Sequence, residues 1–375
     1  MFMHVGVPKE IKNHEYRVGL TPAAAAELVM HGHQVSIEHN AGAAIGFSDA
    51  DYQQAGAQLA DVDTLFAEAQ LIVKVKEPQA AERARLREGQ ILFTYLHLAP
   101  DPEQTNDLLA SGATCIAYET VTDARGHLPL LAPMSEVAGR MAIQAGAGCL
   151  EKARGGRGVL LGGVPGVPRG KVVILGGGVV GSNALAMAVG VGAEVTVLDK
   201  SPDVLRRLDA EYGNRIQTLY STATTLEQEV IAADLVVGAV LIPGAAAPKL
   251  ISAELIARMQ PGAVLVDVAI DQGGCAETSR PTTHAEPTYI VDQVVHYCVA
   301  NMPGAVARTA TQALNNATLP FVLALANKGV RQALEDDPHL LNGLNIAQGK
   351  LTNAGVGDAL NIAVQPLADA LAALS

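Results

Sequence analysis

The chain alternates short runs of apolar, often β-branched residues with longer stretches rich in Ala, Leu, Glu and Arg. The short runs predict strands and the longer stretches predict helices, an order typical of parallel α/β folds. The strands expected before residue 130 are Met3–Val7, Gln34–Glu38, Leu71–Lys76, Ile91–Leu96 and Ala113–Tyr118. The helices expected between them are Pro22–His31, Asp61–Ala69, Ala80–Arg87 and Pro102–Ser111.

The same alternation continues through the second half of the chain. Ser135 is expected to cap a long amphipathic helix, Glu136–Ala153, which runs into a glycine-rich loop. Another long helix is expected from Ala305 to about Leu325, kinked at Pro320. Residues 331–375 are rich in Ala and Leu, and this composition predicts a largely helical segment. The further strands expected are Leu235–Val240, Ala263–Ala269 and Val294–Val299.

A glycine pattern stands between two apolar runs near the middle of the chain. Val172–Leu175 is followed by Gly176, Gly178 and Gly181 in the spacing GxGxxG, then by an Ala-rich stretch and a second apolar run that ends in Asp199. The first glycine allows a tight turn, the second lets the backbone approach a pyrophosphate, and the third lets helix and strand pack closely. A carboxylate at the end of the second strand can bind the ribose hydroxyls. This arrangement predicts a dinucleotide-binding unit.

The position of this pattern predicts two domains of α/β class, both Rossmann-like. Because the glycine pattern begins near the middle of the 375-residue chain, we expect the dinucleotide-binding domain, 136–303, to be inserted into a second domain. That second domain is built from both chain ends, 1–135 and 304–375. It is the expected catalytic, substrate-binding domain.

Composition excludes several classes of function. The 26 basic and 38 acidic residues give a net charge of −12, and no basic patch with aromatic residues appears, so nucleic acid is not an expected partner. The start of the chain lacks a signal-peptide pattern, and the uncharged stretch 172–193 fits strand–turn–helix better than a membrane span. We therefore expect a soluble cytoplasmic protein. Its four scattered cysteines predict buried, reduced thiols, and no metal-ligand spacing is visible.

Several polar residues stand at or just beyond expected strand ends. Lys74 and Lys76 are either solvated lysines on an edge strand or a cationic anchor where α/β ligands bind. His97 directly follows an apolar run and is either a core histidine or a catalytic one. Asp267 falls inside a strand, where a structural hydrogen-bond acceptor is expected, whereas Asp271 precedes two glycines on a loop. A loop there can carry a carboxylate to the nicotinamide.

Arg17 stands on a loop before the helix opened by Thr21 and Pro22, and alone it would be a surface arginine. Taken with the other residues it completes a chemical set: cations for a carboxylate, an imidazole, a carboxylate and a hydride acceptor. This set is the one needed to oxidise an amino or hydroxy acid.

Eight blocks of the sequence closely resemble the bacterial L-alanine dehydrogenase family. They are GVPKEIKNHEYRVGLTP, LIVKVKEP, ILFTYLHLA, AYETV, LPLLAPMSEVAGRMA, GGRGVLLGGVPGV, VDVAIDQGG and CVANMPGAVARTAT. They lie in the family's order from residue 6 to about residue 311. The resemblance to the NAD-binding part of proton-translocating transhydrogenase is more distant.

The resemblance implies NAD-dependent oxidative deamination of L-alanine to pyruvate and ammonium, together with the reverse reaction. It implies that Arg17 and Lys76 bind the substrate carboxylate and that His97 and Asp271 are the acid/base residues, with their roles undivided. It also implies a homo-oligomer, typically a hexamer. The expected NAD-binding residues are Ser135, Gly176, Gly178, Val179, Val180, Gly181, Asp199, Ser221, Val240, Leu241 and Asn301.

Three alternatives stay open from the residues themselves. One is a transhydrogenase-like component that passes hydride between nucleotides, and another is an NAD-binding regulator without chemistry. The third is a dehydrogenase for another small amino or hydroxy acid, because pocket walls cannot be deduced from sequence.

Overall fold

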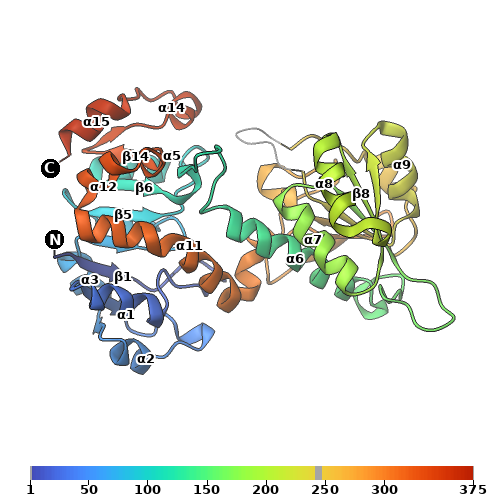
Figure 1. Cartoon of the computed structure of the whole chain (residues 1–375), viewed down its shortest axis with the longest axis horizontal. Coiled ribbons are helices and arrows are strands. Elements are labelled where there is room, and N and C mark those ends of the chain that lie inside the picture. Colours follow the sequence, from blue (N-terminus) through green and yellow to red (C-terminus); the bar gives the residue numbers. More distant parts are fainter. Residues whose placement is uncertain (1, 241–246, 375) are drawn as a thin grey trace. The chain divides into compact units, whose positions relative to one another are not determined.

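The structure, a computed structural model, describes residues 2–240 and 247–374. Contacts divide the chain into two compact units. Unit 1 comprises Met1–Met134 and Val306–Ser375, and unit 2 comprises Ser135–Ala305. Both chain ends therefore belong to unit 1, as the N and C labels of Figure 1 show. Which unit binds substrate and which binds cofactor remains a prediction.

Unit 1 is built around a mostly parallel sheet. Within the described residues, the sheet has eight strands in the order β15-β14-β6-β5-β4-β1-β2-β3. The strands from β6 to β3 pair in parallel, whereas β14 pairs antiparallel with β6. The elements are β1 (His4–Val7), α1 (Pro22–Met30), β2 (Gln34–Glu38), α2 (Asp49–Gln54), β3 (Gln58–Ala60), α3 (Val62–Glu68), β4 (Leu71–Val73), α4 (Ala80–Arg83), β5 (Ile91–Thr94), α5 (Pro102–Ser111), β6 (Thr114–Ala117), α11 (Ala307–Lys328), α12 (Val330–Asp336), α13 (Pro338–Leu341), β14 (Leu344–Ala347), β15 (Lys350–Leu351), α14 (Ala354–Leu360) and α15 (Leu367–Ala373).

Unit 2 has a second mostly parallel sheet. Its described strands follow the order β12-β13-β11-β10-β7-β8-β9, and β12 alone among them runs antiparallel to its neighbour. Helix α6 (Ala132–Cys149) carries the chain from unit 1 into unit 2. The other elements are β7 (Lys171–Leu175), α7 (Val179–Gly190), β8 (Glu194–Asp199), α8 (Pro202–Tyr212), β9 (Gln217–Tyr220), α9 (Ala223–Ala232), β10 (Leu235–Gly238), α10 (Ala253–Ala257), β11 (Val264–Asp267), β12 (Thr288–Val291) and β13 (Val294–Tyr297). The predicted α/β class with two parallel-dominated sheets is confirmed.

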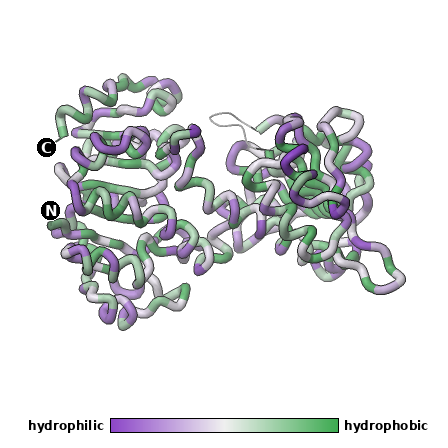
Figure 2. Tube along the Cα trace, in the orientation of Figure 1, coloured by the Kyte–Doolittle hydropathy of each residue, from purple (hydrophilic) through white to green (hydrophobic). Residues whose placement is uncertain are grey.

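The central strands of both sheets are buried along almost their whole length. In β7 and β10 every residue except Lys171 is buried, which is why their sequences read as continuous apolar runs. Figure 2 shows the hydrophobic residues concentrated on the strands inside each unit. All four cysteines lie in these interiors as free, buried thiols, as predicted. None of the helices in the described chain combines the length and the hydropathy that a membrane span requires.

Several sequence-based expectations about elements are wrong. Strands β4, β5 and β11 end two or three residues before the expected bounds. Ser135 does not cap a helix, because α6 begins at Ala132 and Ser135 lies in its first turn. The last segment is not simply helical, because β14 and β15 extend the sheet of unit 1 beyond β6. These strands contain four and two residues, too short for a period-2 pattern, so the Ala/Leu-rich composition around them favoured a helix.

Candidate active site

Three of the predicted site residues in unit 1 follow the carboxyl ends of neighbouring strands. Strands β5, β4 and β1 are adjacent and parallel. Arg17 lies on the loop after β1, Lys76 follows β4, and His97 follows β5. Because parallel strands end at the same edge of a sheet, the three residues belong to the edge where α/β proteins bind ligands.

Arg17 is not a surface arginine. Its side chain is 2% exposed and forms two hydrogen bonds to the buried carboxylate of Glu15, from Nε to Oε1 at 2.7 Å and from Nη2 to Oε2 at 2.6 Å. Nη1 also donates to the sulfur of Met134 at 3.1 Å. Burial opposes the charge on Arg17, but the Glu15 carboxylate outweighs it and raises the pKa of the guanidinium. Arg17 is therefore a permanent cation held in one plane.

Lys76 is a partly buried cation beside other cations. Its ammonium lies 4.0 Å from the carboxylate of Glu77, and its side chain is 16% exposed. Burial lowers the pKa of Lys76; Glu77 opposes this, while the positive charges of Arg17 and Lys12 lower it further. The Lys76 backbone is anchored, since its N–H donates to Glu10 at 3.3 Å and its carbonyl accepts from the hydroxyl of Thr94 at 2.9 Å. Lys76 thus has a fixed backbone and a side chain that senses both carboxylates and cations.

Lys74 does not lie on an edge strand, so the alternative of solvated lysines is wrong. Strand β4 lies between β1 and β5, and Lys74, just beyond it, is 0% exposed. The ammonium pairs with Glu10 at 3.1 Å and Glu82 at 2.6 Å. Burial opposes the charge on Lys74, but the two carboxylates outweigh it and raise the pKa of the amine. Glu10 also holds the backbone just before Lys76, because its carboxylate accepts the N–H of Val75 at 2.7 Å.

His97 has an unusual backbone and an accessible ring. Its φ is +49°, in the left-handed region that non-glycine residues rarely adopt. The side chain is 45% exposed, so His97 is not the core histidine of the alternative interpretation. Its imidazole stacks on the ring of Tyr95, with the planes 5° apart and the centroids 5.8 Å apart. An imidazole at this position can contact a small-molecule substrate.

The glycine turn of unit 2 has the geometry that dinucleotide binding needs. Gly176 has φ +98°, and a Cβ on Gly181 would lie 1.7 Å from the Gly176 carbonyl oxygen. A Cβ on Gly178 would meet no atom within 4 Å, so space is open beside this backbone. Gly178 is also the N-cap of α7 and brings no side chain to the N–H groups of the first turn, which include Val179 and Val180. Such a helix start suits a pyrophosphate.

Asp199 ends β8 beside this turn, as predicted. Its Oδ2 accepts the N–H of Gly177 at 2.7 Å and its Oδ1 accepts the N–H of Ser201 at 2.7 Å. Sequence reasoning missed Arg207, which donates to the Gly177 carbonyl at 3.0 Å and to the hydroxyl of Ser182 at 3.1 Å. Arg207 is one of two consecutive arginines on α8, and nothing in the sequence distinguishes it from its neighbour.

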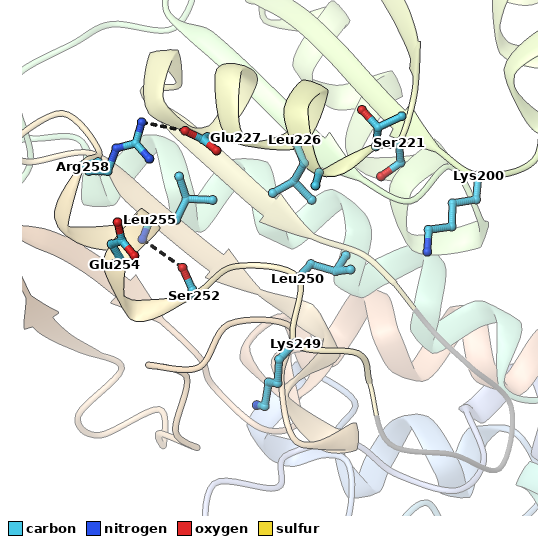
Figure 3. A pocket seen from close by; sticks show the side chains of 12 residues that line it. Lys200, Ser221, Leu226, Glu227, Lys249, Leu250, Ser252, Glu254, Leu255 and Arg258 are labelled. Carbon is cyan, nitrogen blue, oxygen red and sulfur yellow. Dashed lines mark hydrogen bonds and ion pairs between the residues drawn. The ribbon is translucent and has the colours of Figure 1, made fainter.

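A pocket of about 590 Å³ lies on unit 2 next to the strand that ends in Asp199 (Figure 3). Ser221, a predicted cofactor residue, lines this pocket together with Lys200 and Lys249. The Ser221 N–H donates to the carbonyl of Asp199 at 2.9 Å, which keeps the ends of β8 and β9 together. Lys249 donates to the carbonyl of Ala276 at 3.1 Å, and in Figure 3 its ammonium points away from Ser221. The pocket has the place in the fold expected for an adenosine.

The remaining predicted cofactor residues are dispersed over unit 2. Ser135 lies in the first turn of α6, and Val240 follows β10. Asn301 has φ +68°, and its carbonyl accepts the N–H of Gly304 at 3.0 Å. Leu241 lies outside the described residues.

Asp271 and Asp267 lie in the two different environments that were predicted, a loop for Asp271 and a strand for Asp267. Asp271 is exposed, on a 3-10 turn that follows β11. Asp267 is 0% exposed and accepts from the backbone of Ala269 at 3.2 Å, the backbone of Cys275 at 2.8 Å and the hydroxyl of Ser279 at 2.5 Å. These bonds hold both sides of the loop that carries Asp271. Asp267 is therefore a structural acceptor.

Arg17, Lys76 and His97 belong to unit 1, whereas Asp271 and the predicted cofactor residues belong to unit 2. The described residues contain no group of three or more His, Cys, Asp or Glu side chains that could hold a metal ion. Unit 1 thus offers cations and an imidazole, and unit 2 offers a carboxylate and a glycine turn with the geometry for dinucleotide binding.

Two family models match the chain. The model described as alanine dehydrogenase/PNT, N-terminal domain, matches residues 6–138, and the model described as alanine dehydrogenase/PNT, C-terminal domain, matches residues 142–354. Together they cover most of both units.

Similar proteins carry the same description. An alanine dehydrogenase of Halomonas elongata is 65% identical over 361 residues, covering 96% of this chain and 97% of that one. An alanine dehydrogenase of Mycobacterium tuberculosis is 56% identical over 371 residues, covering 99% and 100%. A solved L-alanine dehydrogenase superposes with a TM-score of 0.94 at 53% identity over 96% and 99% of the chains. A transhydrogenase of Sinorhizobium meliloti, with a TM-score of 0.80 at 23% identity over 94% and 99%, shares the fold.

Proposed function

Because the chain belongs to the alanine dehydrogenase/PNT family, we propose that it catalyses NAD-dependent oxidative deamination of L-alanine and the reverse reductive amination. In the forward direction L-alanine, NAD⁺ and water give pyruvate, ammonium, NADH and a proton. Family membership implies an oxidoreductase with a nicotinamide dinucleotide cofactor.

The observation that carries this proposal is the pair of buried cations in unit 1. Arg17 is 2% exposed and Lys76 has a side chain that is 16% exposed, and both follow strands that end at one edge of the sheet. Two cations at the edge of the sheet where α/β proteins bind ligands suit an anionic ligand. A protein that only bound NAD would need no second site of this kind.

The cofactor that we propose is NAD. The turn from Gly176 to Gly181 offers space and helix N–H groups to a pyrophosphate, and Asp199 offers a carboxylate to the adenosine ribose. The same carboxylate repels a 2′-phosphate, which disfavours NADP. When bound, the nicotinamide takes up the hydride that leaves the substrate Cα.

Arg17 and Lys76 would hold the substrate. The guanidinium of Arg17, fixed in plane by Glu15, can bind a carboxylate through two parallel hydrogen bonds. Lys76 would neutralise the carboxylate further and polarise the carbonyl oxygen of pyruvate in the reverse direction. Fixing the carboxylate orients Cα for hydride transfer, which lowers the entropic part of the barrier.

His97 and Asp271 would move the protons. The amine of alanine must be neutral before hydride can leave Cα, so a base must accept its proton. Water then attacks the iminium carbon, and the carbinolamine expels ammonia; each step needs a proton donor or acceptor that works near neutral pH. An imidazole suits both directions of transfer. Asp271 would orient the water, hold the ammonium or accept the proton.

We further propose a cytoplasmic homo-oligomer, a hexamer in keeping with the family, with no nucleic-acid or membrane partner. Because the chain shares its fold with a transhydrogenase, the second candidate function is hydride transfer between nucleotides without an amino-acid substrate.

One assay tests the proposal against these alternatives. The purified chain is incubated with NAD⁺ at alkaline pH and L-alanine, D-alanine, L-serine or L-lactate, and NADH absorbance is followed. The proposal requires NADH with L-alanine and little with the other three. Tight NADH binding without turnover on any of them would favour the transhydrogenase-like or regulatory alternative.

A further inference from the structure

One conspicuous sequence block, AYETV, has no part in the mechanism above. Its acidic residue, Glu119, lies in the 3-10 helix Tyr118–Thr120 that follows β6. Strands β5 and β6 are parallel neighbours, with Thr94 opposite Ala117, so the chain after β6 runs beside the chain after β5. The segment after β5 is the one that carries His97.

Glu119 binds the backbone on which His97 is mounted. Its Oε1 accepts the N–H of His97 at 2.6 Å and the N–H of Leu96 at 3.1 Å, and its Oε2 accepts the N–H of Leu96 at 3.2 Å. Hydrogen bonds to an ionised acceptor are stronger than those between neutral groups. One carboxylate therefore holds two consecutive peptide groups.

These bonds act where the backbone is least favourable. His97 has φ +49°, and an L residue with a side chain adopts this conformation only where its surroundings enforce it. On the other side of the same segment, the buried Gln104 donates to the Leu96 carbonyl at 2.6 Å. Gln104 and Glu119 thus hold the carbonyl and the N–H of the Leu96–His97 peptide unit, and Glu119 also holds the preceding peptide unit through the N–H of Leu96.

The ring of His97 is restrained by the same surroundings. Nδ1 lies 3.9 Å from Oε1 of Glu119, and one face of the imidazole stacks on Tyr95. Tyr95 is itself fixed, because its hydroxyl donates to the Leu130 carbonyl at 2.5 Å. The imidazole is oriented by a carboxylate near Nδ1 and an aromatic face, while 45% of the side chain stays exposed.

We propose that Glu119 is a positioning residue for the reaction: it fixes the left-handed backbone of His97 and thereby places the imidazole for proton transfer. This inference rests on the proposed acid/base role of His97. Glu119 acts through His97 and does not itself contact substrate.

Two substitutions of Glu119 distinguish the effect of its hydrogen-bond acceptors from the effect of its negative charge. Glu119→Ala removes every acceptor, so the His97 backbone can relax and kcat should fall roughly 10- to 100-fold, as for other small misplacements of a catalytic group. Glu119→Gln keeps an amide oxygen that can accept both N–H groups, and it should retain kcat within about 5-fold. Glu103→Ala, which removes a carboxylate that is 79% exposed in the same unit, is the matched control and should leave kcat unchanged.

A double-mutant cycle distinguishes positioning from a general structural role. If Glu119 acts through His97, Glu119→Ala should cause no further loss of kcat in a His97→Ala background. The NADH dissociation constant and the thermal midpoint of each variant check that the fold and the cofactor site are intact. An equal fractional loss in both backgrounds, or wild-type kcat for Glu119→Ala, would overturn the inference. Wild-type kcat for His97→Ala would instead remove the proposed role of His97, and this inference with it.

Discussion

Arg17 and Glu15 are joined by two parallel hydrogen bonds inside unit 1, at 2.7 and 2.6 Å, with side chains that are 2% and 0% exposed. Glu15 thereby fixes the plane of the Arg17 guanidinium, which lies only two residues further along the chain. A buried ion pair of this geometry is sensitive to the loss of either member, because the other is left as an uncompensated charge.

Arg17→Ala should therefore lower both substrate affinity and stability. The KM for L-alanine should rise at least ~10-fold, since uniform binding to the carboxylate is lost, and the free energy of unfolding should fall by about 3–5 kcal/mol. Steady-state kinetics and denaturant unfolding measure the two effects. The double variant Glu15→Gln/Arg17→Ala removes the buried charge and should recover much of the stability without recovering the KM. If Arg17→Ala changes neither quantity, Arg17 has no role in binding.

His97→Ala should lower kcat by at least ~100-fold, the lower range for loss of a general acid or base. Asp271→Asn should also lower kcat, because the carboxylate is exposed on a turn anchored by Asp267 and can contact bound reactants. Both variants should bind NADH like the unmodified protein, which fluorescence titration can establish. Retention of near-normal kcat by either variant would exclude that residue from proton transfer.

Asp199 should set the preference for NAD over NADP. Repulsion between its carboxylate and a 2′-phosphate amounts to several kcal/mol when two like charges meet, so kcat/KM for NAD should exceed that for NADP by at least ~100-fold. Asp199→Asn keeps an oxygen to accept the N–H of Gly177 but removes the charge. The variant should therefore have a smaller ratio of kcat/KM for NAD to kcat/KM for NADP. Equal use of both cofactors by the unmodified protein would show that Asp199 does not face the ribose.

Lys74→Met should destabilise unit 1 in a pH-dependent way. Burial and the charge of Glu82 raise the pKa of Glu10, while Lys74 lowers it. Without Lys74 the pKa of Glu10 rises further, so the folded state binds a proton that the unfolded state releases, and stability falls as pH rises. The free energy of unfolding should fall by about 3–5 kcal/mol. Urea unfolding should show a larger fall at about pH 8 than at about pH 5.5.

Glu10→Gln/Lys74→Met is the control for this prediction. This double variant removes the Glu10 carboxylate and keeps an amide oxygen that can accept the N–H of Val75. Its free energy of unfolding should therefore depend less on pH than that of Lys74→Met. A loss of stability that is independent of pH would show that Glu10 does not titrate in the variant.

The position of most strands in the chain was predictable from sequence, whereas their last residues and the partners of their side chains were not. Apolar residues dominate β4, β5 and β11 because these strands are buried on both faces, so the polar residues that follow them stand out, among them Lys76, His97 and Asp271. The three glycines of the nucleotide turn were predictable for a similar reason, because each has a steric purpose at a fixed spacing.

The partners of these residues depend on contacts between distant segments. Glu10 meets Lys74 across 64 positions, and Glu119 meets His97 across 22, so no local pattern marks either pair. Arg17 likewise donates to the sulfur of Met134, 117 positions along the chain. Strand β14 was missed because it is defined by its pairing with β6 and not by its own composition.

The central claim, that hydride passes from Cα of L-alanine to the nicotinamide, is tested most directly by isotope transfer. The purified protein is incubated with NAD⁺ and L-alanine deuterated at Cα, and the reduced cofactor is examined by mass spectrometry and proton NMR. Our account predicts one deuterium at C4 of the nicotinamide, with pyruvate and ammonium formed in equal amounts. Reduced cofactor without deuterium, or none formed at all, would contradict it.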